Sequence, residues 1–64
     1  MTQAFLDACL IRDRLVDQLR DRVTDDEKVA WVHYLVYGTD RENVPMPLVR
    51  AQDEVMRCLE LLKE

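Results

Sequence analysis

The sequence predicts a single all-α domain, a compact bundle of three helices, and three observations support this fold class. Residues 3–23 and residues 47–63 each repeat apolar side chains at helical spacing. Residues 25–37 follow a helix-capping sequence and precede the only glycine of the chain. With 64 residues, positions 1–64 have room for one domain and no more.

The first helix is expected over residues 3–23, with Thr2 as its N-cap. Its apolar residues fall within about one third of a helical wheel, which indicates one buried face. They are Ala4, Phe5, Ala8, Ile11, Leu15, Val16, Leu19 and Val23. The opposite face carries aspartates and arginines three or four residues apart, a pattern typical of a solvated helix surface.

The second helix is expected over residues 25–37. Thr24–Glu27 matches the capping box, with a threonine at the N-cap, a glutamate at the third helical position and acids at the positive end of the helix dipole. Gly38 suits the left-handed position that ends many helices. The β-branched and aromatic residues of Val29–Tyr37 would also suit a strand, but no other segment offers a partner strand.

A polar loop over residues 38–46 leads to a third helix over residues 47–63, with Pro47 at its first position. Its inner stripe is expected to be Leu48, Ala51, Val55, Cys58, Leu59 and Leu62, with Gln52 at the edge. In an up-down-up bundle the first and third helices run parallel. Cys9 and Cys58 would then lie at opposite ends, and we expect no disulfide between them.

The second helix is apolar nearly all round, because His33 is the only clearly polar residue between Val29 and Tyr37. A helix without a polar face must be covered on more than one side, and two flanking helices of so short a chain cover only part of it. Small domains also gain stability by self-association. We therefore expect a homodimer or higher oligomer through this helix; in the alternative, the two long helices enclose it. The residues expected to contact a partner are Trp31, Tyr34, Tyr37, Arg41 and Glu42.

Arg12 lies at the centre of the apolar face of the first helix. One interpretation is that its apolar stem packs on the bundle while its guanidinium reaches solvent at the edge. A second is a buried pair with a carboxylate, within the chain or across a dimer. A third is an anion-binding role, because the guanidinium fork fits a carboxylate or phosphate.

No pattern in the chain predicts catalysis, a metal or a cofactor, and we expect a protein that is not an enzyme. Cys9, His33 and Cys58 are too widely spaced for a zinc site. Nothing supplies an oxyanion hole for a cysteine nucleophile. One glycine excludes a glycine-rich phosphate loop. The net charge of −4 disfavours a phosphate-backbone ligand, so we expect no general nucleic-acid binding.

The leading hypothesis is a small acidic protein-binding module that occludes or bridges another protein, of the type of phage- or plasmid-encoded inhibitors and adaptors. One alternative is a binder of a small anionic, nucleotide-like ligand at an oligomer interface, using Arg12, His33 or Arg41. Another is a helix-turn-helix-like DNA binder that reads with the third helix. Since the sequence shows neither a leader nor a long apolar run, we expect no membrane partner and a bacterial or host-cell cytoplasm.

Overall fold

The structure, a computed structural model, describes residues 2–63 and is all-helical over that range. It contains α1 (Gln3–Leu19), α2 (Asp25–Tyr37) and α3 (Met46–Lys63), with a 3-10 helix, η1 (Arg41–Asn43), between the last two. The expected three-helix bundle is confirmed. The helix bounds differ at two places: α1 ends four residues before position 23, and α3 begins one residue before Pro47.

The capping signals of the sequence all form. The Thr2 hydroxyl accepts a hydrogen bond from the backbone N–H of Phe5. Both halves of the capping box at the start of α2 are present, because Thr24 Oγ1 accepts from the Glu27 N–H at 3.1 Å and Glu27 Oε1 accepts from the Thr24 N–H at 3.0 Å. Gly38 takes the left-handed conformation, with φ of 74°. Local chemistry therefore sets where α2 begins and ends.

The early end of α1 follows from the cap of α2. Thr24 is extended, with ψ of 165°, so the chain has to leave the helical conformation before it. It does so through a tight turn in which the N–H groups of Arg22 and Val23 both donate to the carbonyl of Leu19. Residues 20–23, which were predicted to be the last residues of the first helix, therefore form this turn.

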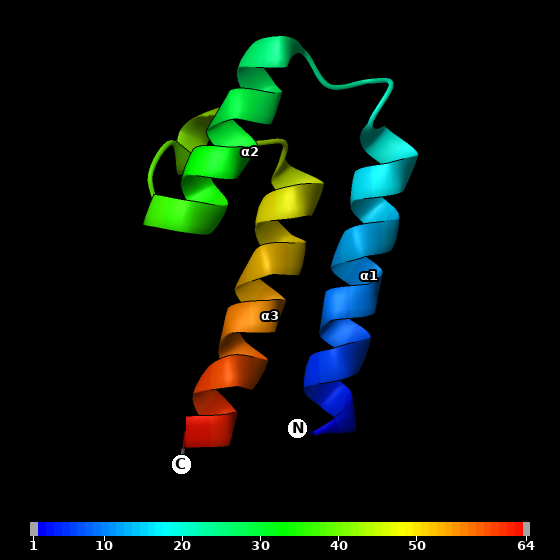
Figure 1. Ribbon diagram of the computed structural model, residues 1–64, viewed down its shortest axis with the longest axis vertical. Helices are drawn as coiled ribbons and strands as arrows, with labels where there is room; N and C mark the ends of the chain where they lie inside the picture. Colours follow the sequence, from blue (N-terminus) through cyan, green and yellow to red (C-terminus); the bar gives the residue numbers. More distant parts are fainter. Residues whose placement is uncertain (1, 64) are drawn as a thin grey trace.

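The direction of α3 differs from the expected one. Figure 1 shows α1 running away from the N-terminus and α3 running back, so that both chain ends lie at the same end of the bundle. After α2 the chain passes alongside this helix through η1 before α3 begins. Consequently α1 and α3 are antiparallel, whereas α2 and α3 run in a similar direction. The parallel arrangement was wrong because it assumed a connection that makes a simple turn.

The antiparallel arrangement also changes the surroundings of the cysteines. Cys9 packs against a buried cluster of Ala8, Val55 and Cys58, so both thiols lie at the end of the bundle where the chain termini meet. Both cysteines are free. The stated reason against a disulfide, placement at opposite ends, is therefore wrong.

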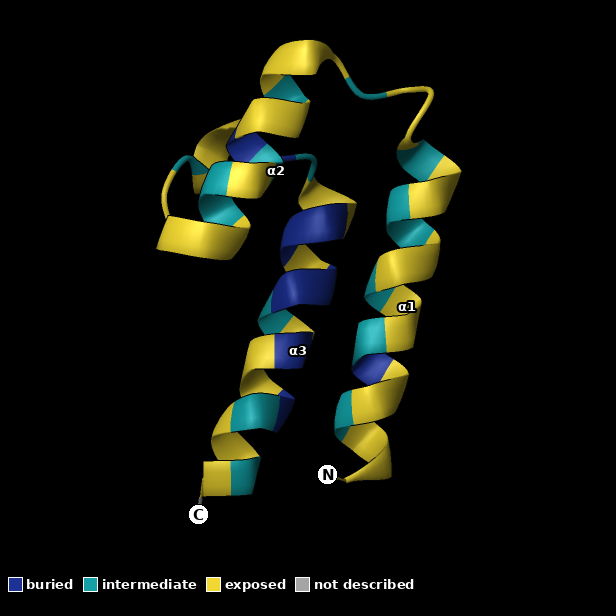
Figure 2. Ribbon diagram, in the orientation of Figure 1, coloured by how far each residue is buried: buried dark blue, intermediate teal, exposed yellow. Residues whose placement is uncertain are grey.

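The core has two parts with different cover. In the three-helix half, side chains of α1 and α2 pack on a buried cluster of Ala30, Val44, Leu48 and Val49. In the two-helix half, the second cluster is made by α1 and α3 alone. Figure 2 shows the buried residues concentrated on α3, where it faces its neighbours, and exposed residues along the outside of all three helices.

Two apolar positions depart from the predicted stripes. Val49, expected off the inner stripe of α3, is the most deeply buried side chain, with 1% exposure, because α2 covers the flank of α3 that α1 does not reach. Ile11, expected on the inner stripe of α1, is 55% exposed. It lies at the edge of the α1–α3 contact, beside Leu15 and Pro47.

Candidate protein-binding surfaces

The outer face of α2 carries three exposed valines. Val29, Val32 and Val36 are 53%, 54% and 64% exposed, and at about 100° per residue they fall within about 60° of the helical wheel. The opposite side of the helix holds Ala30, which is buried, and Tyr34, which packs on the core. We call Val29, Val32 and Val36 the valine stripe. It belongs to the apolar surface of the second helix that the other helices leave uncovered.

The aromatic residues predicted to contact a partner are placed differently from one another. Trp31 and Tyr34 are half-buried and pack on the core cluster of the three-helix half, so they do not form the uncovered patch expected of them. Their rings are 6.4 Å apart. Tyr37, in contrast, is 73% exposed. Trp31 and Tyr34 lie on the side of α2 that faces the core, whereas the three valines lie on the outward side.

Sequence reasoning missed the valine stripe as a surface. Its signal was present in the spacing of Val29, Val32 and Val36, which recur at helical intervals within an otherwise apolar segment. That signal could not be used alone, because the choice of the buried face depends on where α1 and α3 lie.

Arg41, a second predicted contact residue, belongs to a polar network that joins η1, α2 and α3. Its guanidinium donates to both carboxylate oxygens of Asp53, at 3.1 and 2.7 Å, and the Tyr34 hydroxyl donates to Asp53 at 2.7 Å. The guanidinium also lies 5.9 Å from the centre of the Tyr34 ring. The neighbouring predicted residue, Glu42, is exposed on η1.

The network shifts the titration of its members. Desolvation by burial, followed by the hydrogen bond to Asp53, raises the pKa of Tyr34. The hydrogen bonds from Tyr34 and Arg41 hold the pKa of Asp53 below its ordinary value. This arrangement holds the segment between α2 and α3 in place, so its main effect is structural.

His33 pairs with the loop that follows its own helix. Its Nδ1 lies 2.8 Å from Oδ2 of Asp40, a residue in the left-handed conformation with φ of 61°. The imidazole also meets the Tyr37 ring edge-on, with centroids 6.1 Å apart. His33 is thus a half-buried residue that anchors the loop after Gly38.

Arg12 lies in a cleft between the three helices. Its Nη1 donates to Oε1 of the buried Gln52 at 3.0 Å, and its Nε lies 3.4 Å from Asp13. Of the three interpretations, the structure agrees best with a stem packed at the bundle edge, because the partner across the bundle is a neutral amide. The cleft has a volume of about 520 Å³ and is lined by Arg12, Asp13, Val16, Asp17, Trp31, Leu35 and Gln52. We call it the Arg12 groove.

The residues proposed for an anionic ligand do not line a common cavity. His33 borders a separate shallow hollow on α2, and Arg41 is bound to Asp53. The Arg12 groove contains two aspartates against one arginine, which is unfavourable for an anion. Among residues 2–63, no three histidine, cysteine, aspartate or glutamate side chains gather to hold a metal ion.

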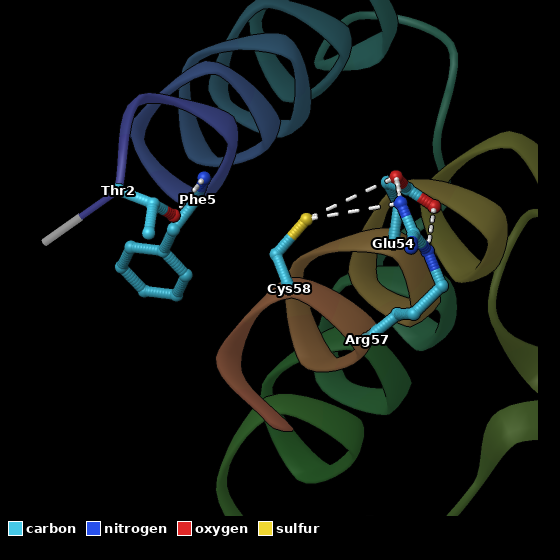
Figure 3. Close-up of polar contacts among 5 residues, drawn as sticks. All are labelled: Thr2, Phe5, Glu54, Arg57 and Cys58. Carbon is cyan, nitrogen blue, oxygen red and sulfur yellow. Dashed lines mark hydrogen bonds and ion pairs between the residues drawn. The ribbon is translucent and has the colours of Figure 1, made fainter. Parts of the chain in front are cut away.

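The end of the bundle that holds Cys58 carries one more ion pair. Figure 3 shows the Cys58 thiol pointing toward Glu54 and Arg57, which lie beside it on α3. Arg57 forms a two-pronged ion pair with Glu54 and thereby lowers the pKa of that carboxyl. The pair lies on the exposed side of α3 and lines none of the clefts described here.

No protein family model, curated protein or solved structure matches the chain. None of the described helices combines the length and the apolar character that crossing a membrane requires.

Proposed function

We propose that this protein is a non-catalytic protein-binding module that assembles as a homodimer through the outer face of α2. The observation that carries the proposal is the valine stripe, in which three β-branched apolar side chains on one helix face are more than half exposed. Contiguous exposed apolar patches on small proteins usually mark interaction surfaces. Tyr37, at the end of the same helix, extends the apolar surface.

The dimensions of the molecule support an association partner. The radius of gyration is 12.0 Å, against about 10.7 Å for a compact domain of this length. The accessible surface is 4859 Å², about 600 Å² more than the roughly 4,300 Å² expected of a compact monomer of 7.6 kDa. A stable interface covers about 800 Å² on each partner, so one such contact would remove this surplus.

Two copies of the chain could bury the valine stripe by packing their α2 helices antiparallel across a two-fold axis near Val32. Val29 of one copy would then meet Val36 of the other, and the antiparallel helix dipoles would attract each other. Because Val32 would lie closest to the axis, a charge at this position would meet its own copy. Dimer formation is therefore most sensitive to Val32.

Light scattering coupled to gel filtration at micromolar concentration tests the proposal. The native chain is expected at about twice its 7.6 kDa, and Val32→Glu at the monomer mass. Leu61→Glu is the matched control, since Leu61 is 57% exposed on α3, away from the stripe, and its substitution is expected to leave the dimer intact. Substituting Trp31 or Tyr34 would be uninformative, because both pack on the core. A monomer mass for the native chain contradicts the proposal.

The proposal extends to a second protein, which the module would occlude or bridge. It is supported by apolar surface outside α2. That surface includes Leu6, Leu10 and Met56, which are 46%, 48% and 44% exposed. The DNA-binding alternative gains no support, because the whole segment from Gly38 to Pro45 separates α2 from α3, where helix-turn-helix proteins use a turn of about three to four residues.

A further inference from the structure

The Arg12 groove continues sideways into a straight stripe on α1. Leu6, Leu10, Asp13 and Asp17 follow one another at intervals of four, three and four residues, which places them on one face of the helix. The two leucines are about half exposed and the two aspartates are exposed. Across the groove, α2 presents Leu35, which is 40% exposed. The combined surface is apolar toward the start of α1 and acidic toward its end.

The acidic part of this surface is only partly compensated by positive charge. Asp13 and Asp17 are four residues apart on one helix, where like charges destabilise each other by a few tenths of a kcal/mol. Asp13 has one long contact with Arg12, and Asp17 makes no ion pair with any of residues 2–63. A cation placed over the pair would relieve this repulsion.

We propose that the Arg12 groove and the adjoining stripe on α1 bind a basic amphipathic helix of another protein. Lysine or arginine side chains of that helix would meet Asp13 and Asp17, and its apolar side chains would pack on Leu6, Leu10 and Leu35. This inference rests on the proposed function as a protein-binding module and names its partner class. The geometry favours a helix, because a straight stripe with helical spacing beside a groove between two helices is the shape that a third helix fits.

The charge argument separates this occupant from two others. An anion would face two carboxylates and a single guanidinium that is already bonded to Gln52. A second copy of the chain would bring the same surface, whose one arginine is already bonded to Gln52, so an aspartate would have to lie against a leucine. A basic partner would place neither a negative charge against the carboxylates nor an aspartate against a leucine. The net charge of −4 would also attract it toward the chain.

The test uses the fluorescence of Trp31, the only tryptophan, which lines the groove. The probe is a synthetic helical peptide of about 14 residues, roughly 21 Å long, built from leucine and lysine. Its control is the same peptide with glutamate in place of lysine. The lysine peptide is expected to shift the Trp31 emission and to bind more weakly as salt rises, whereas the glutamate peptide should cause no shift.

Matched variants locate the site. Asp13→Asn/Asp17→Asn is expected to weaken binding by about fivefold for each carboxylate lost. Asp26→Asn/Glu60→Gln removes the same net charge from exposed positions on α2 and α3 and should change binding by less than about twofold. Equal effects of the two double variants, equal binding of the two peptides, or an unchanged emission with the lysine peptide would each overturn the inference.

The same samples distinguish this inference from the homodimer. The monomeric Val32→Glu chain is expected to bind the lysine peptide as the native chain does. If the peptide fails to bind while light scattering still returns a dimer, the groove inference alone is lost. If Asp13→Asn/Asp17→Asn changes the mass of the native assembly, the groove is a contact between copies and the basic-helix inference is overturned.

Discussion

The contact between Arg12 and Gln52 allows a quantitative test of how α1 and α3 are held together. Gln52 is 8% exposed, and its Oε1 accepts a hydrogen bond from Arg12 Nη1 at 3.0 Å. Arg12→Leu removes the donor and leaves a buried carbonyl unpaired, which costs about 1–3 kcal/mol. Gln52→Leu should cost less than about 1 kcal/mol, because the Arg12 guanidinium still reaches Asp13 and solvent.

The double variant Arg12→Leu/Gln52→Leu removes both partners together. No polar group is then left unpaired, and the stability is expected within about 0.5 kcal/mol of the native chain or above it. The double-mutant cycle therefore predicts a coupling energy of at least about 1 kcal/mol between the two positions.

Urea unfolding followed by far-ultraviolet circular dichroism, at one fixed protein concentration, measures these free energies of unfolding. Arg14→Leu combined with Gln52→Leu is the control cycle, since Arg14 is exposed on α1 and is expected to show no coupling. If the effects of Arg12→Leu and Gln52→Leu add to within about 0.5 kcal/mol, the reasoning is refuted.

Three further predictions concern the helix ends and the network around Asp53. Thr24→Ala should lower the free energy of unfolding by about 1 kcal/mol in urea titrations, because the capping box with Glu27 is lost. Gly38→Ala should cost about 1–2 kcal/mol from backbone conformation alone, since φ is 74° and no atom lies within 4 Å of an added Cβ; a change below about 0.3 kcal/mol contradicts this. In thermal melts across pH, the contribution of Asp53, whose folded pKa is lowered, should be present above about pH 4 and lost as the pH falls through that folded value. That of Tyr34, whose pKa is raised, should be present below about pH 10 and lost above it. Asp53→Asn should reduce the loss on the acid side without abolishing it, because the pKa of Glu54 is also lowered.

The three helices and both ends of α2 were predictable because the responsible interactions are local. The capping box joins residues three apart, and Gly38 ends α2 through its own backbone freedom. The inner stripe of α3 was also largely correct, since Leu48, Ala51, Val55 and Cys58 are all buried. Periodicity within one helix is enough to identify such a stripe.

The candidate surface was predictable only as a property of α2. An apolar helix with one polar residue indicated uncovered surface, and the structure leaves such surface exposed. Which residues form it depended on the packing direction, and the predicted Trp31 and Tyr34 face the core while Val32 and Val36 face outward. The choice between these two sides of the helix is made by the contacts of α2 with α1 and α3.

By itself the sequence determined the helical class, the helix ends around residues 24 and 38 and the surplus of apolar surface, since each depends on spacing or on neighbours a few residues apart. Only the tertiary structure decided that α3 returns antiparallel to α1, that Val49 is buried and that Arg12 meets Gln52. These features join residues far apart in the chain. The path of the segment after Gly38 sets their register, and no local pattern in the sequence encodes that path.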